Sequence, residues 1–156
     1  MSAVQSAFPP GAEHRVGGRT VFVCTVGDRE YWLAQTGVGL EKAGRSAAQL
    51  LDNQSFSLVV STGFACALIA ADIGALLVGR EVVYRANQSD GPSEVLDVPG
   101  DERELAVTSV ETLVPSEHIG RFVSTDHIIG SAREKQMFAL RTQAIGLDME
   151  SSALAA

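Results

Sequence analysis

The stretch that most constrains the fold of this chain lies at residues 145–152 and reads IGLDMESS. It begins as an apolar run typical of a buried strand and turns polar at Asp148 and Glu150. Such a strand carries both carboxylates to its carboxyl end, where open α/β sheets bind ligands. Glu150 is suited to grip a vicinal diol, such as the hydroxyls of a ribose, with Met149 packed on the sugar. The competing interpretation is that Asp148 caps a following helix and Glu150 is a favourable first-turn charge.

Composition limits the size and the partners of the protein. A chain of 156 residues with 46% hydrophobic content is one ordinary domain with a real core. A net charge of −7 argues against a nucleic acid or an anionic membrane as partner. Cys24 and Cys66 show no metal-like spacing and no secretory leader accompanies them, so the sequence predicts a reduced, cytoplasmic protein.

Residues 56–79 raise the question of a membrane span, because they contain no Lys or Arg and are long enough to cross a bilayer. Asp72 near the middle would be costly in lipid, and glycines divide the run into short pieces. We therefore predict a strand at 57–62, a glycine turn, a short helix and a further strand within 75–84.

The rest of the chain is organised by glycine, proline and apolar periodicity. Residues 1–19 are predicted to be loose and residues 20–156 to form a single domain. The polar segment 86–103 is predicted to be an exposed loop. Further strands are predicted at 20–26, 30–36, 105–109, 121–129 and 144–148, and helices at 40–52, from 116 onward, and at 131–140 with a capping box. This order indicates an α/β fold with a mixed central sheet flanked by helices.

A glycine turn, Thr36-Gly37-Val38-Gly39, opens onto the predicted helix at 40–52. Backbone N–H groups bared at a helix start can hold an anion or a polar ligand. The same glycines can also serve geometry alone.

Four motifs then occur in order: TGVG at 36–39, STGFACAL at 61–68, VSTDHII at 123–129 and LDMES at 147–151. Together they resemble the nucleoside phosphorylase/nucleosidase superfamily, most closely the methylthioadenosine/S-adenosylhomocysteine nucleosidases. The resemblance covers about residues 30–156. It implies a three-layer α/β sandwich, incomplete at both ends in this chain.

The resemblance also implies a purine nucleoside site without cofactor or metal. Glu150 would bind the ribose hydroxyls and Met149 would pack on the sugar. The base would be bordered, partly through backbone groups, by His127, Ile128 and Ile129. The attacking water or phosphate would lie near the turn formed by Thr62, Gly63, Phe64 and Ala65.

The implied reaction is hydrolysis of the purine N-glycosidic bond. Ser61 stands where many phosphorylases have a phosphate-binding arginine, which favours water, although Arg45 or Arg133 could supply charge. Phe64 and Cys66 stand where the family has smaller groups and would narrow the nucleophile pocket. The alternatives are phosphorolysis, or a non-catalytic nucleoside-binding or structural remnant.

The departures from the family pattern concern the acid and base. Glu13 is a poor substitute for the family's water-activating glutamate, and the segment with the leaving-group aspartate has no counterpart, so no residue is assigned as proton donor. We therefore expect little or no hydrolysis by this chain. The resemblance adds the expectation of a homodimer or a higher homo-oligomer.

Other residues of chemically reactive or aromatic type are not predicted to be catalytic, metal-binding or base-stacking residues. Asp126 and His127 are adjacent, and adjacent strand residues point to opposite faces, so a catalytic dyad is disfavoured. His14 and His118 have no companion at metal-ligand spacing. Tyr31 and Trp32 are predicted to be core and surface residues of a strand.

Overall fold

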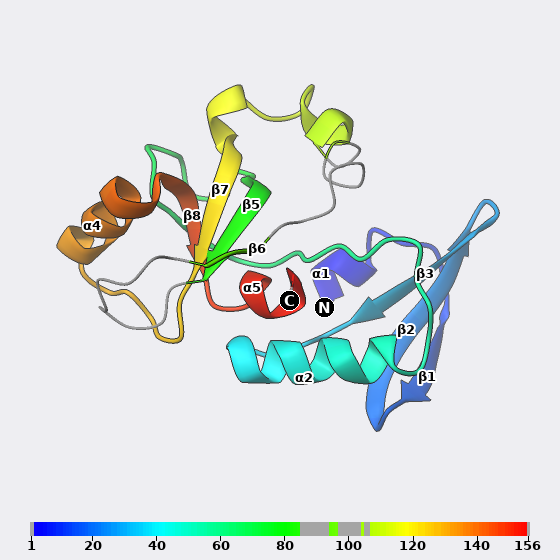
Figure 1. Ribbon diagram of the computed structural model, residues 1–156. Helices are drawn as coiled ribbons and strands as arrows, with labels where there is room; N and C mark the ends of the chain where they lie inside the picture. Colours follow the sequence, from blue (N-terminus) through cyan, green and yellow to red (C-terminus); the bar gives the residue numbers. More distant parts are fainter. Residues whose placement is uncertain (1, 85–93, 97–103, 105–106, 156) are drawn as a thin grey trace.

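The computed structural model describes residues 2–84, 94–96, 104 and 107–155. These residues form two sheets: a three-stranded sheet in the order β1-β2-β3, and a five-stranded sheet in the order β4-β8-β7-β5-β6 (Figure 1). Helix α2 (Leu40–Leu51) packs against the terminal helix α5 (Ser151–Ala155), which in turn contacts strands of the larger sheet. The predicted loop at 86–103 lies outside the described residues, except for β6 (Glu94–Leu96).

The smaller sheet consists of two hairpins built from β1 (Ala12–Val16), β2 (Arg19–Val26) and β3 (Arg29–Ala34). The predicted hairpin across residues 20–36 is therefore confirmed. The prediction that residues 1–19 are loose is wrong, because this segment contains the short helix α1 (Ser2–Gln5) and strand β1. Strand β1 is mostly exposed and shows no apolar alternation; Gly17 and Gly18, at φ 56° and 81°, form the turn that pairs it with β2.

The larger sheet is mixed, as predicted. Its centre consists of three parallel strands, β5 (Val78–Tyr84), β7 (Ile119–Ser124) and β8 (Ala144–Asp148). The two-residue strand β4 (Cys66–Ala67) and β6 run antiparallel at its edges. A buried cluster on this sheet includes Val123, Ala144 and Leu147, and Phe138 from α4 (Ala132–Thr142) packs against it. Two residues of this core, Val123 and Leu147, directly precede the last residues of β7 and β8.

The strand predicted at 57–62 is wrong, because residues 57–65 belong to no strand. Val59 and Val60 are 56% and 72% exposed. Apolar β-branched residues favour a strand but do not select its partner, and the edge of β8 pairs with Cys66 and Ala67 instead. The helix predicted next is also not formed, whereas the strand predicted within 75–84 is β5. None of the helices in the described part of the chain combines the length and apolar character needed to cross a membrane.

Three other predictions need adjustment and two hold. Residues 107–110 are helical rather than part of a strand at 105–109, and residues 105–106 lie outside the described part. The helix predicted from residue 116 is a single 3₁₀ turn, η1 (Ser116–His118). The strand predicted at 121–129 ends at Ser124. Helix α4 and its cap are confirmed, since the Ser131 side chain accepts a hydrogen bond from the Glu134 N–H at 3.1 Å. Strand β8 has the predicted bounds.

Candidate functional site

The candidate site lies at the carboxyl ends of β7 and β8, beside the start of α2. Strand β8 ends at Asp148 and helix α5 begins at Ser151, so Met149 and Glu150 form the turn between them. Both are half-buried. The prediction that a buried strand delivers Asp148 and Glu150 to its carboxyl end is confirmed.

Asp148 has a structural role at this edge. Its Oδ1 accepts a hydrogen bond from the Ser124 hydroxyl at 2.6 Å, and its Oδ2 accepts one from the Ser151 N–H at 3.2 Å. The Ser152 N–H donates to the Ser124 hydroxyl at 3.0 Å, and both serines are buried. Asp148 therefore caps α5 and joins it to β7, as the capping interpretation predicts for this residue.

Glu150 is held by a different part of the chain. Its Oε1 accepts a hydrogen bond from the Gly39 N–H at 2.7 Å, across 111 residues of sequence, and its Oε2 accepts one from the Met149 N–H at 3.2 Å. Gly39 is the N-cap of α2, so the positive end of the helix dipole meets the carboxylate. A carboxylate has about four acceptor positions, so Glu150 retains capacity for further donors.

The glycine turn at 36–39 is fixed against α2. The Ser46 hydroxyl, 1% exposed, donates to the Thr36 carbonyl at 2.7 Å. Gly37 and Gly39 have φ of 91° and 94°, values that favour glycine. The N–H group that this turn bares is thus directed at the protein's own carboxylate, a contact that no sequence pattern predicts.

The loop after β7 is tied to the end of β8. Thr125 is fully buried, its N–H donates to the Asp148 carbonyl at 2.9 Å, and its hydroxyl donates to the His127 carbonyl at 2.8 Å. The next two side chains contact each other, with the Asp126 Oδ1 and His127 Nδ1 atoms 2.6 Å apart. The argument that these side chains point apart is wrong, because the strand ends at Ser124 and its alternation no longer applies.

The two isoleucines of this loop have different environments. Ile128 is 81% exposed, whereas Ile129 is 5% exposed and belongs to the core cluster. A ligand at this edge can therefore meet the side chain of Ile128, but only the backbone of Ile129.

The turn at 61–65 precedes β4, whose Cys66 pairs antiparallel with Leu147. The residues just before Cys66 therefore lie next to the carboxyl end of β8. The side chains of this turn are exposed, and Phe64 is fully so, with 103% relative exposure. Phe64 does not narrow a pocket here. The predicted site residues Thr62, Gly63 and Ala65 lie in this open turn.

Other residues considered from the sequence lie away from this edge or have partners elsewhere. Arg45 pairs with Glu41 on α2, and Glu13 is exposed on β1. In the part of the chain that the structure describes, no group of three or more His, Cys, Asp or Glu side chains could hold a metal ion. Tyr31 and Trp32 make ring contacts with Phe8 and Phe56, respectively.

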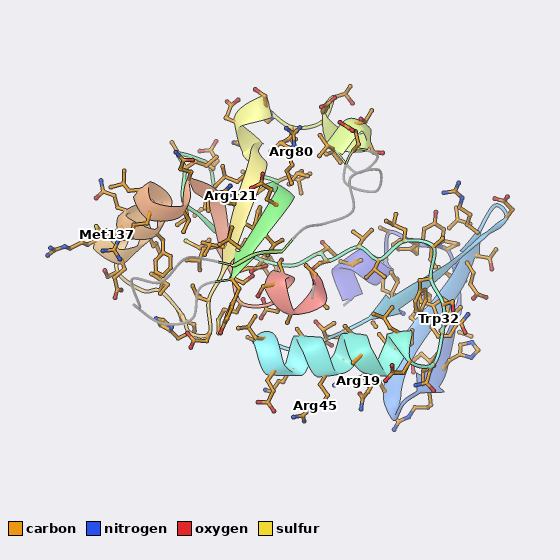
Figure 2. All side chains as sticks on the ribbon, viewed as in Figure 1. Arg19, Trp32, Arg45, Arg80, Arg121 and Met137 are labelled. Atoms are coloured by element: carbon orange, nitrogen blue, oxygen red, sulfur yellow. The ribbon has the colours of Figure 1, made fainter. Side chains whose placement is uncertain are left out.

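Two shallow hollows are found elsewhere. One, of about 220 Å³, includes Arg80, Glu81 and Arg121 at the end of the sheet away from α2 (Figure 2). The other, of about 780 Å³, is lined by residues 70–75 and His118. Neither includes a residue of the carboxyl edge. Hydrogen-bond geometry, rather than concavity, therefore identifies the candidate site.

The mixed sheet, the helices packed on it and the oriented carboxylate define an α/β protein with a candidate ligand site at the carboxyl edge of its sheet. The chain belongs to the phosphorylase superfamily, whose family model matches residues 5–156. The resemblance noted in the sequence is thereby confirmed.

Two relatives are 5′-methylthioadenosine/S-adenosylhomocysteine nucleosidases. The Staphylococcus haemolyticus protein is 28% identical over 141 residues, covering 81% of this chain and 61% of the relative. The Staphylococcus epidermidis protein is 28% identical over 148 residues, covering 86% of this chain and 64% of the relative. The chain thus spans less than two thirds of the length of either protein.

A solved structure supports the fold. The nucleosidase of the same name from Helicobacter pylori, crystallised with butyl-thio-DADMe-Immucillin-A, matches with a TM-score of 0.79 at 19% identity. The match covers 97% of this chain and 71% of that one. The α/β fold predicted from the sequence is therefore that of this group of proteins.

Proposed function

We propose that this chain carries the nucleoside site of an enzyme that hydrolyses the N-glycosidic bond of purine nucleosides. The observation that carries the proposal is the Glu150 carboxylate, held by the Gly39 and Met149 N–H groups at the end of β8. The names of the two staphylococcal relatives, which specify 5′-methylthioadenosine and S-adenosylhomocysteine, support nucleosides of adenine as substrates.

The chemistry follows from where the negative charge lies. As the purine departs, the ribose becomes positively charged and oxocarbenium-like, and a carboxylate on its hydroxyls stabilises that state more than the neutral substrate. Glu150 is oriented before any ligand arrives, so little free energy is spent on ordering it. Met149 is half-buried beside it, and its side chain is proposed to contact the sugar face.

Water is the proposed nucleophile rather than phosphate. Phosphate binding in proteins relies on Arg or Lys held at the site. Ser61 is exposed, Arg45 is paired with Glu41 on α2, and Arg133 is exposed in the first turn of α4. These environments favour hydrolysis over phosphorolysis.

Protonation of the leaving purine is the weak step in this site. Among the described residues, the carboxylates at the carboxyl ends of β7 and β8 are Asp126, Asp148 and Glu150, and each already has a hydrogen-bonding partner. A positioned acid typically contributes about 10²–10⁴-fold to such a reaction. We therefore expect slow turnover by the 156-residue chain, and the same observation favours nucleoside binding without turnover as the second candidate function.

The test follows purine release by chromatography from methylthioadenosine, S-adenosylhomocysteine and adenosine. We expect release well below about 1 s⁻¹, the lower end of the ordinary enzyme range, and its loss in Glu150→Ala. Glu41→Ala, which changes an exposed glutamate on α2, should behave like the unmodified chain.

Two results would count against these proposals. Release that persists unchanged in Glu150→Ala would place the reaction elsewhere. Release at about 1 s⁻¹ or faster that depends on Glu150 would show that an effective acid serves this site. Binding without detectable release would select the second candidate function.

We also propose that the protein is a homodimer in the cytoplasm. Large apolar side chains are exposed along residues 58–76, which supports burial against a second copy; they are Leu58, Val59, Val60, Phe64, Ile73 and Leu76. The free thiols of Cys24 and Cys66 fit a reducing compartment. Light scattering at micromolar concentration should give twice the chain mass, and a monodisperse monomer would contradict the dimer.

A further inference from the structure

We propose that Asp126 and His127 form a fixed pair that selects the substituent at position 6 of the purine, favouring an amino group over an oxo group. This inference rests on the proposed function and adds to it a specificity-determining side chain. It starts from the Asp126 Oδ1 and His127 Nδ1 atoms, which are 2.6 Å apart at the end of β7.

The partner determines which ring nitrogen carries the proton. An ionised carboxylate can only accept hydrogen bonds, so in the neutral imidazole the proton must be on Nδ1. The other nitrogen, Nε2, then carries a lone pair and acts only as an acceptor. Asp126 thus gives His127 a defined polarity toward a ligand.

The pair is also fixed in position. The Thr125 hydroxyl donates to the His127 carbonyl at 2.8 Å, and the Thr125 N–H donates to the carbonyl of Asp148 at 2.9 Å. The loop therefore begins level with the last residue of β8, two residues before Glu150. A nucleoside whose ribose is held at Glu150 can extend its base along this edge toward the imidazole.

Both side chains remain open to a ligand. The side chain of His127 is 46% exposed and that of Asp126 is 38% exposed. Within the described residues, the hydrogen bond of the ring uses Nδ1 and leaves Nε2 for an external partner. An acceptor at this point accepts a hydrogen bond from the N–H of a 6-amino group. The oxygen of a 6-oxo group is also an acceptor, so its lone pairs and that of Nε2 repel each other.

The test is a set of calorimetric titrations, all carried out at pH 8 in one buffer. The ligands are adenosine, inosine and unsubstituted purine riboside, which lacks any group at position 6. The unmodified chain should bind adenosine about tenfold more tightly than either of the others, the value of one hydrogen bond.

Asp126→Asn is the decisive variant, because its amide can donate a hydrogen bond to Nδ1 and so move the ring proton to Nε2. The preference for adenosine over inosine should then disappear or invert. His127→Phe should bind all three nucleosides alike. Asp28→Asn, in the hairpin turn between β2 and β3, is the matched control and should keep the original order.

The outcomes separate this inference from the proposed function. An unchanged adenosine-to-inosine ratio in Asp126→Asn, or an equal loss of affinity for all three ligands, would overturn it. If in that case Glu150→Gln still abolishes discrimination between adenosine and 2′-deoxyadenosine, the proposed ribose site stands alone. Failure of the unmodified chain to bind any nucleoside would overturn both.

Discussion

Two segments of this chain have nearly the same local sequence, but one forms a buried strand and the other is exposed outside any strand. Residues 59–62 read VVST and residues 122–125 read FVST. In the second segment the four exposed fractions run from 8% to 0%, whereas in the first segment Val59 and Val60 are 56% and 72% exposed. The local preference for a β-strand is nearly the same in both segments, so the difference in burial must come from the tertiary contacts that each segment makes.

Strand β7 has a partner strand on both sides, β5 and β8, whereas residues 59–62 pair with no strand in the described part of the chain. The polar ends of the two segments differ in the same way. Ser124 and Thr125 are bonded to Asp148, while Ser61 and Thr62 are exposed. A strand motif thus becomes a ligand-site element only where neighbouring strands satisfy its backbone and order its hydroxyls.

The largest expected effect is on stability, from a matched pair of phenylalanines. Phe122 is 8% exposed and its ring lies where a Cβ at Gly146 would come within 2.7 Å, whereas Phe64 is 103% exposed. Phe122→Ala should lower the free energy of unfolding by about 3–5 kcal/mol. In the single chain, at concentrations too low for a dimer, Phe64→Ala should change it by less than about 0.5 kcal/mol. Denaturant titration measures both, and equal losses would mean that residues 57–65 are packed in solution.

A smaller effect is expected from the serines at equivalent places in the two segments. Ser124→Ala removes a donor from Asp148 and leaves the buried Ser152 N–H without its acceptor. We expect a loss of about 1–3 kcal/mol in the free energy of unfolding. Ser61→Ala, at an exposed position, should be nearly neutral. A neutral Ser124→Ala would refute the view that this network orders the edge.

The smallest effect concerns ligand affinity and compares two glycines of one turn. Gly37 and Gly39 have similar positive φ, so alanine strains the backbone at either position by about 1–3 kcal/mol. Only Gly39 donates to Glu150. Gly39→Ala should therefore weaken adenosine binding by about 0.5–1.5 kcal/mol, and Gly37→Ala should not. Equal affinities of the two variants by calorimetry would show that the α2 contact does not position Glu150.

The elements that could be predicted from sequence are those specified by neighbouring residues. Strand β8 follows from an unbroken apolar run, and α4 from a capping box whose Ser131 to Glu134 contact is local. The pattern does not predict strand β1, because Gly17 and Gly18 are typical of breaks in structure, whereas here they form the turn of its hairpin. The strand predicted at 57–62 is not formed, because an apolar β-branched run does not specify a strand to pair with.

The candidate site shows the same division. The position of Glu150 at a strand end follows from the motif, but its bond to Gly39 joins residues 111 positions apart. The contact between Asp126 and His127 depends on β7 ending at Ser124, and strand ends are the least predictable feature of a pattern. The contacts of the candidate site that the sequence does not predict thus depend on long-range partners or on the exact ends of the strands.

The central claim is that Glu150 binds a ribose diol, and the most direct test compares adenosine with 2′-deoxyadenosine. Calorimetry on the unmodified chain should show that loss of the 2′-hydroxyl weakens binding by about 1–3 kcal/mol, the value of a charge-assisted hydrogen bond. Glu150→Gln should weaken adenosine binding by a similar amount and bring the two ligands close to equal affinity. Equal affinities for the two nucleosides in the unmodified chain, unchanged by Glu150→Gln, would contradict the ribose site.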